Sequence, residues 1–281
     1  MVIPVYDVNP VRRTPWMNYA LIAANIIVFL LTPTSRTFVV RGDTLAQTCQ
    51  QEAFYHQYGA IPREMLRNRQ LAVVPNGQVG RGPNGPGCVV GRPTYHKDPI
   101  LSVLFAMFLH GGWLHLLGNM LFLWVFGNNI EDRLGRIRYL VFYLFCGYLA
   151  AYGFALASAD SSQALIGASG AIAGVLGAYI VLYPRAKVWS LVPFLFFIPL
   201  RLSAWIVLGL WFVLQGLYSS GYAVSGGGAV AYLAHVVGFT VGVLIGLVLR
   251  ETGPQPPRQR RPPHFGPMPR PHPPPSPWDR W

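Results

Sequence analysis

The stretch IGASGAIAGVLGAY, residues 166–179, decides the fold, because it opens an apolar run that can span a membrane and carries one hydroxyl, Ser169, near its start. Gly167, Ala168 and Gly170 surround this serine with small residues. Small residues leave room for another helix or a peptide backbone to approach. The first N–H groups of a helix also have no partners within the helix. A serine in this setting becomes a candidate nucleophile if the fold brings a base to it.

The composition of the chain is that of a membrane protein, since 52% of its 281 residues are hydrophobic and only 11% are charged. A helix needs roughly 20 apolar residues to cross about 30 Å of hydrocarbon. Such runs predict six membrane-spanning helices, at residues 16–32, 104–126, 138–157, 167–183, 202–219 and 229–249. The predicted fold class is therefore an all-α membrane protein with a six-helix bundle.

Other segments flank these spans or lie between them. Residues 188–200 are apolar but short and contain two prolines, which predicts a re-entrant or interfacial segment. Residues 33–100 form a long outer loop between the first two spans, and residues 251–281 form a Pro/Arg-rich cytoplasmic tail that we expect to be disordered. The predicted organisation is thus an N-terminal segment, 1–15, a six-helix domain, 16–250, and the tail.

The basic residues predict the orientation, because short cytoplasmic loops retain Lys and Arg during insertion. Basic residues precede span one, follow span two, separate spans four and five, and follow span six, whereas the loops at about 158–166 and 220–228 carry none. The remaining eight of the 22 lie between spans one and two, in a segment long enough to be exempt from the rule. Both termini are therefore predicted to be cytoplasmic.

The first apolar run, residues 16–32, is not followed by an A-x-A-like cleavage site, which favours an uncleaved span over a signal peptide. The lack of an organelle-targeting presequence favours a bacterial inner (plasma) membrane.

The outer loop contains two cysteines, Cys49 and Cys88, that face an oxidising compartment in this topology. A disulfide between them is one hypothesis, and two unpaired thiols are the other. The turn-rich stretch PNGQVGRGPNGPG, residues 75–87, predicts a flexible surface loop. His56 and His96 are expected to be solvated loop residues.

Polar side chains capable of chemistry occur in three of the spans: His110, His115 and Asn119 in FLHGGWLHLLGNM, Ser169 in GASG, and His235 in AHVVGFTVG. An ionisable residue at membrane depth is costly and is a functional candidate by default. Spans two, four and six all enter from the outer side, and each polar group lies early in its span. At about 1.5 Å of rise per residue, these groups can share one depth near the outer surface.

This constellation predicts nucleophilic catalysis. Ser169 is the candidate nucleophile and His235 the candidate base, because imidazole titrates near working pH and can take the proton from Oγ. His115 and Asn119, four residues apart, project from one face of their helix. With the free N–H groups at the start of the serine helix, they are candidate donors to an oxyanion.

A third residue that orients the base is not evident from the sequence. From residue 134 to residue 250 the only acid is Asp160, and nothing places it against His235, so a Ser-His dyad is the simpler interpretation.

Each candidate residue also has an alternative, purely structural role. The G-x-x-x-G motifs at 170–174 and 238–242 are typical of close helix packing, and a single intramembrane His or Asn can bond a neighbouring helix.

Three motifs resemble those of the rhomboid intramembrane serine proteases, in the order found in that family: H-x4-H-x3-N at 110–119, G-A-S-G at 167–170 and A-H-x2-G at 234–238. The stretch FGNNIEDRLGRIRYL after the second span also looks like the family's cytoplasmic turn. The resemblance covers roughly residues 16–250. It implies a six-helix rhomboid-type bundle and a serine endopeptidase that cleaves transmembrane segments of other membrane proteins through an acyl-enzyme, without a cofactor or a metal.

The resemblance also implies a role for each matching residue. Ser169 is the nucleophile, His235 is its general base, and His115 and Asn119 are oxyanion donors together with the backbone N–H of Ser169. The supporting residues are His110, Gly167, Gly170 and Gly238.

The chain departs from the family pattern at two places. Some members have a Trp-Arg pair shortly before the first histidine and an aromatic residue four positions after the serine. Here these positions are Leu101-Ser102 and Ala173. The resemblance therefore leaves the orientation of His235 and the geometry of the outer loop open.

Other classes of function remain as alternatives. A transporter would more naturally have charged or discontinuous helices at the midplane, and a non-catalytic rhomboid-like binding protein would usually lack the serine or the histidine. A zinc site at His110, His115 and His235 lacks the H-E-x-x-H motif. The expected partners are transmembrane protein substrates and membrane lipids, and not nucleic acid. The sequence leaves the oligomeric state open.

Overall fold

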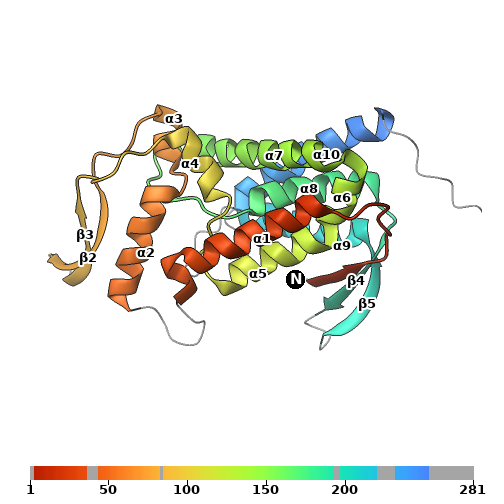
Figure 1. The fold of residues 1–281 in the computed structure, drawn as a ribbon, viewed down its shortest axis with the longest axis horizontal. Coiled ribbons are helices and arrows are strands. Elements are labelled where there is room, and N and C mark those ends of the chain that lie inside the picture. Colours follow the sequence, from red (N-terminus) through yellow and green to blue (C-terminus); the bar gives the residue numbers. More distant parts are fainter. Residues whose placement is uncertain (1–2, 37–43, 83–84, 193–196, 220–231, 253–281) are drawn as a thin grey trace, which may run out of the picture.

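The molecule is a bundle of helices with small β-structures at its two ends (Figure 1). The computed structural model describes residues 3–36, 44–82, 85–192, 197–219 and 232–252. The bundle consists of α1 (Trp16–Leu31), α5 (Trp113–Phe122), α6 (Asn128–Leu134), α7 (Arg136–Ala157), α8 (Ser169–Leu182), α9 (Ala204–Ser219) and α10 (Tyr232–Thr252). The predicted tail lies outside the described residues from residue 253 onward.

Five of the six predicted spans correspond to single helices. Two of the described helices, α7 and α10, are long and apolar enough to cross a membrane by length and composition. The apolar helices α1, α8 and α9 are shorter, with 16, 14 and 16 residues. The number of spans therefore stays a prediction.

The predicted second span, residues 104–126, is not one helix. Helix α4 (Pro99–Ala106) covers only the first three residues of this span, and α5 begins at Trp113 after an irregular turn. Gly112 enters α5 with an extended backbone, φ 160° and ψ 171°, which breaks the helical path. A π-helical segment, η2 (Leu123–Gly127), then joins α5 to α6. This interruption places His110 in a loop instead of a helix.

A three-stranded antiparallel sheet forms one end of the molecule, with the order β1 (Ile3–Asp7), β4 (Lys187–Val192), β5 (Ile198–Ser203). Residues 188–192 and 198–200 of the expected re-entrant or interfacial segment therefore lie in strands β4 and β5, and the fold is mostly helical instead of strictly all-α. The physical reason is the alternation of buried and exposed residues along β4, where Val188, Ser190 and Val192 are buried, because a period of two is typical of a strand. Pro199 is accommodated because β5 is an edge strand.

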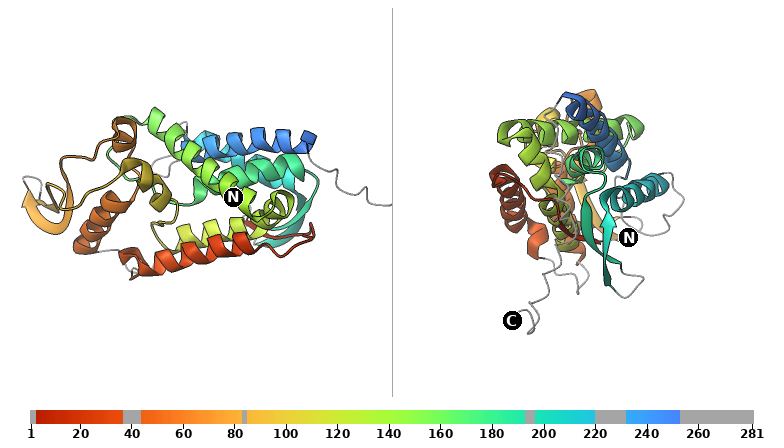
Figure 2. Two further views of the ribbon diagram at one scale, coloured as in Figure 1. Left: turned by 45° about the horizontal axis from the view of Figure 1, so that its top comes forward. Right: turned by 90° about the vertical axis from the view of Figure 1, so that its right-hand side faces the viewer.

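The outer segment forms the opposite end of the molecule, as both Figure 1 and Figure 2 show. It contains η1 (Pro33–Arg36), α2 (Leu45–Tyr58), α3 (Pro62–Arg67) and a hairpin of β2 (Val74–Gly82) and β3 (Gly85–Gly91). The expectation of a flexible loop over residues 75–87 was wrong, because most of these residues pair in the hairpin. The disulfide hypothesis is confirmed, since Cys49 of α2 bonds Cys88 of β3.

A buried ion pair and two polar contacts hold the outer segment together and fix it to the bundle. Lys97 Nζ lies 2.7 Å from Glu64 Oε2, and it also donates to the backbone oxygen of His56 in α2. Burial lowers the pKa of Lys97, and Glu64 partly offsets this effect. Ala60 and Leu165 exchange two backbone hydrogen bonds, which ties the outer segment to the loop before Ser169. His56 is thus not a solvated loop residue, although His96 is exposed as expected.

Helices α8 and α10 pack with their backbones in direct contact. A Cβ atom added at Gly238 would overlap the carbonyl oxygen of Gly170, and one added at Gly242 would overlap that of Gly174. Only glycine permits this approach. The G-x-x-x-G motifs therefore set the distance between the helix that carries Ser169 and the helix that carries His235.

A network of buried polar groups joins the N-terminal segment to the bundle at the end opposite the outer segment. Glu131 accepts hydrogen bonds from the backbone N–H groups of Met17 and Asn18, which satisfies free donors at the start of α1. Asp7 accepts from Asn129 Nδ2 and from the hydroxyl of Tyr179, each at 2.6 Å. Because Tyr179 belongs to α8, strand β1 is linked to the serine helix.

Asp7 predicts a pH dependence of stability. Burial raises the pKa of its carboxyl group from 3.8 to about 6, against the opposing hydrogen bonds from Tyr179 and Asn9. A carboxyl whose folded pKa is raised stabilises the fold in its protonated form, so stability should fall as the pH rises from about 4 to about 6 and then level off, by at most about 3 kcal/mol. Asp7→Asn keeps an acceptor oxygen and should remove this slope. Thermal unfolding in detergent between pH 4.5 and pH 7.5 measures it, and equal slopes in both proteins would contradict the assignment.

Candidate active site

The structure brings Ser169 and His235 together, as the sequence predicts. Ser169 is the first residue of α8, and His235 lies in the first turn of α10. The Nε2 atom of His235 lies 2.7 Å from Oγ of Ser169. This contact joins residues that are 66 positions apart in sequence, and the glycine contacts between α8 and α10 make it possible. A hydrogen bond of this length places a base against a nucleophile.

The second ring nitrogen of His235 contacts a residue that the sequence analysis missed. Nδ1 lies 2.7 Å from Oε1 of Gln215 in α9. Gln215 is 6% exposed, and it is a polar amide in the apolar stretch WFVLQGLYSS. That isolation was a signal that could have identified it, because a polar side chain at membrane depth seeks a partner on a neighbouring helix. Asp160 is not the third member, since its side chain is 89% exposed and forms an ion pair with Arg67 at the surface.

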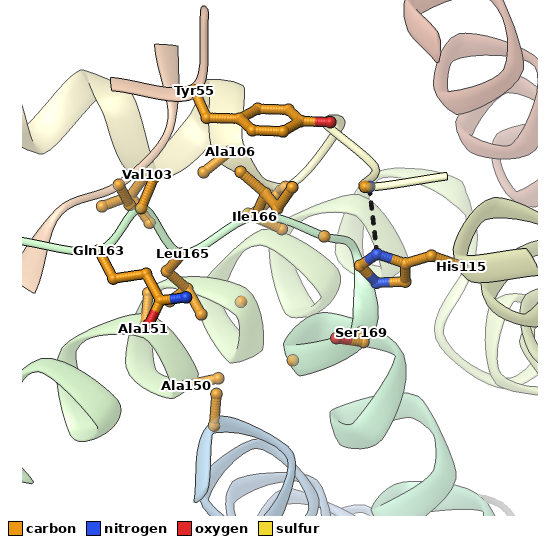
Figure 3. Close-up of a pocket in the computed structure, with 18 of the residues that line it drawn as sticks. Tyr55, Val103, Ala106, His115, Ala150, Ala151, Gln163, Leu165, Ile166 and Ser169 are labelled. Atoms are coloured by element: carbon orange, nitrogen blue, oxygen red, sulfur yellow. Dashed lines mark hydrogen bonds between the residues drawn. The ribbon is translucent and has the colours of Figure 1, made fainter. Parts of the chain in front are cut away.

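The proposed oxyanion donors lie beside the serine. The backbone N–H of Gly111 donates to Nδ1 of His115, at 3.3 Å (Figure 3). The proton of a neutral His115 therefore resides on Nε2, and this atom faces the loop before Ser169, because a Cβ atom at Gly167 would lie 2.8 Å from it. Gly167 also has a positive φ of 122°, so a larger residue would be unfavourable there on both grounds.

Asn119 presents a free donor to the same space. Its side chain is 9% exposed, and its Nδ2 atom has no hydrogen-bond partner within the described part of the chain. Asn119 lines one cavity together with His115, Ser169 and His235. A buried donor without a partner is costly, which is expected where a ligand atom completes the site.

His110 lies next to this group and outside the cavity. It is fully buried, with its ring centroid 5.1 Å from that of His115. The hydroxyl of Tyr55 in α2 donates to its backbone oxygen at 3.0 Å. His110 thus connects the outer segment to the turn before α5, which matches a supporting role. Among the described residues, no three His, Cys, Asp or Glu side chains converge as a metal site requires.

The cavity at this site has a volume of about 970 Å³. Its walls come from the outer segment, α4, the loop before Ser169, the middle of α7, and α5, α8 and α10. Figure 3 shows Tyr55 and Ile166 above Ser169 and His115, with Ala150 and Ala151 of α7 on another side. Most of the labelled lining is small or apolar, and His115 lies beside Ser169, whereas Gln163 and Tyr55 lie farther from the serine. A cavity with these walls suits an apolar peptide segment whose carbonyl group meets the serine.

Comparison with known proteins identifies the class. The model of the Rhomboid domain family matches residues 97–252, more than half of the chain. The protein belongs to the rhomboid family and is a helical membrane protein.

Individual relatives agree with this assignment. The chain is similar to "Rhomboid protein 1, mitochondrial" of Saccharomyces cerevisiae, with 31% identity over 52% of this chain and 41% of the relative. It is 32% identical to "RHOMBOID-like protein 1" of Arabidopsis thaliana over 83% of this chain and 53% of the relative. It is 30% identical to "Rhomboid-type serine protease 2" of Emericella nidulans over 59% and 29%, respectively.

The chain spans about half the length of the curated relatives that it matches, 41% to 61% for the first three. Some relatives are named as proteases and others as rhomboid-like proteins. Several are named as mitochondrial. The comparisons therefore support a membrane location, and they give no support for a bacterial inner membrane in particular.

Proposed function

We propose that the protein is an intramembrane serine endopeptidase that cleaves transmembrane segments of other membrane proteins. The observation that carries this proposal is the 2.7 Å contact between Oγ of Ser169 and Nε2 of His235. The contact lies in a cavity that also holds Asn119, whose Nδ2 has no hydrogen-bond partner among the residues that the structure describes. A nucleophile, a base and an oxyanion donor in one cavity are the parts that acyl transfer requires.

In the first half of the reaction, Oγ of Ser169 attacks the carbonyl carbon of the scissile bond, and its proton passes to Nε2 of His235. The carbonyl oxygen becomes an oxyanion, which accepts hydrogen bonds from His115, Asn119 and the backbone N–H of Ser169. His235 then gives the proton to the leaving nitrogen as the C–N bond breaks, which leaves an acyl-enzyme. Water attacks the ester with His235 as base, and loss of the acid product restores Ser169.

The position of the site addresses the two physical difficulties of this reaction. Hydrolysis needs water, and the cavity extends to residues of the outer segment, such as Glu52 and Tyr55. A helical substrate hides its carbonyl groups in internal hydrogen bonds. We therefore expect that cleavage favours substrates with helix-weakening residues near the scissile bond and small side chains before it.

We also propose that both termini of the protein lie on the cytoplasmic side, because the short loops on that side carry the Lys and Arg residues.

Labelling with a fluorophosphonate tests the proposed pair directly. The reagent should modify Ser169 in the wild-type protein, because His235 activates its Oγ, and labelling should fall to background in Ser169→Ala and in His235→Ala. Mass spectrometry of the labelled peptide identifies the site. Labelling that persists in His235→Ala would leave the base unassigned, and an unlabelled wild-type protein would favour a non-catalytic rhomboid-like binding protein.

A further inference from the structure

The geometry around His235 points to an additional residue of the site. We infer that Gln215 is a positioning residue that selects the catalytic tautomer of His235 and holds its ring toward Ser169. The inference rests on the proposed function, since it concerns the base of that reaction. It adds a third helix, α9, to the two that carry the nucleophile and the base.

The tautomer of the base matters because a neutral imidazole has one donor and one acceptor nitrogen. To take the proton of Ser169, Nε2 must carry the lone pair, so the proton must reside on Nδ1. Oε1 of Gln215, at 2.7 Å from Nδ1, is an acceptor that favours this arrangement. Without an acceptor at Nδ1, the other neutral tautomer of His235, which carries its proton on Nε2 and donates to Oγ, is no longer disfavoured. That tautomer cannot act as the base, because its Nε2 has no lone pair available for the proton of Ser169.

Helix α9 presents two side chains to His235 from one face. Trp211 and Gln215 are four residues apart, and the ring centroid of Trp211 lies 5.9 Å from that of His235 at an interplanar angle of 33°. Phe212 stacks on Phe239 of α10, with centroids 4.4 Å apart. The aromatic contacts fix α9 against α10, and the buried amide of Gln215 fixes the ring of His235.

The use of an amide suits the surroundings. A carboxylate in a buried position is stabilising only when it is fully paired, and its desolvation is costly. An amide oxygen supplies an acceptor without adding a charge. The partner of the base is therefore an amide and not an acid, and Asp160 lies at the surface instead.

Substitutions at Gln215 separate positioning from simple packing. Gln215→Leu keeps the volume and removes the acceptor, and we expect kcat to fall roughly 10- to 100-fold while KM changes less than about twofold. Gln215→Glu, in contrast, keeps an acceptor oxygen at this position in either orientation of the side chain. This variant should retain most of the wild-type kcat. The acidic limb of its pH profile should move to higher pH, because a carboxylate beside the imidazole of His235 favours the protonated imidazole.

The assay uses the full chain in liposomes with a fluorescent transmembrane substrate, and Gln78→Leu on β2 serves as the matched substitution away from the site. If Gln215 only filled space, Leu would be tolerated and Glu would be harmful, and this outcome would overturn the inference. A Gln215→Leu enzyme with wild-type kcat and an unchanged pH profile would also overturn it. Failure of the proposed function is distinguishable, because the wild type and Ser169→Ala would then behave alike.

Discussion

Ser169→Ala is expected to reduce cleavage of a transmembrane substrate to background, a loss of at least about 10³-fold. The substitution removes only Oγ, which is the hydrogen-bond partner of Nε2 of His235. The backbone of α8 is unchanged, and alanine favours a helix. The measurement is release of a fluorophore by purified protein in liposomes, at equal amounts of folded enzyme.

Ser219→Ala provides the matched control. Its hydroxyl bonds the backbone oxygen of Gly216 within α9, so the same atom is removed from the same bundle at a distance from the cavity. Cleavage by this variant should equal that of the wild type. Equal cleavage by Ser169→Ala and the wild type would rule out Ser169 as the nucleophile, whatever the control showed.

Gly242→Leu is expected to cause the second large effect. Any Cβ atom at position 242 overlaps the backbone of Gly174, and a backbone atom cannot move aside as a side chain can. Helices α8 and α10 must therefore separate, which costs on the order of 3 kcal/mol or more of stability. The separation also moves His235 away from Ser169. Because a displacement of about 1 Å can cost 10²-fold in rate, we expect activity to fall at least about 100-fold.

Gly209→Leu on α9 is the matched substitution, because apart from its own turn of helix no described atom lies within 4 Å of the position that its Cβ would take. It should change the unfolding temperature little and retain activity. Thermal unfolding in detergent and substrate cleavage, measured on the same preparations, test both expectations. A Gly242→Leu protein as stable and as active as Gly209→Leu would show that the backbone contact does not set the site.

The parts of the site that the sequence could predict are those fixed by local chemistry. Ser169 and His235 were identifiable because each is an isolated polar group in an apolar helix, and the topology placed both near one surface. Gln215 has the same isolation, but an uncharged amide gives a weaker signal than an imidazole, and only the packing of α9 against α10 connects it to the base. Its role therefore depends on a contact between helices that no local pattern contains.

The fold was predictable where apolar length decides the structure and not where tertiary contacts decide it. Residues 188–200 are apolar enough for a membrane segment, but residues 188–192 belong to strand β4, which pairs with β1, far away in sequence, and with β5. The span predicted at 104–126 passes through Gly111 and Gly112, where the backbone turns. Glycine permits such a turn, but glycines also occur inside α8, so composition alone could not distinguish the two cases.

The contact between α8 and α10 has a consequence for how a substrate gains access. Ser169 and His235 lie on helices whose backbones are in direct contact, so we expect α8 and α10 to move as one rigid element. If these two helices separated far enough to admit a peptide, Ser169 and His235 would lose their contact. Under the proposed function, the movement that admits a substrate therefore comes from the surrounding parts. Helix α9 is the candidate, because its displacement would also release the ring of His235 from Gln215 and leave the protein inactive until α9 returned.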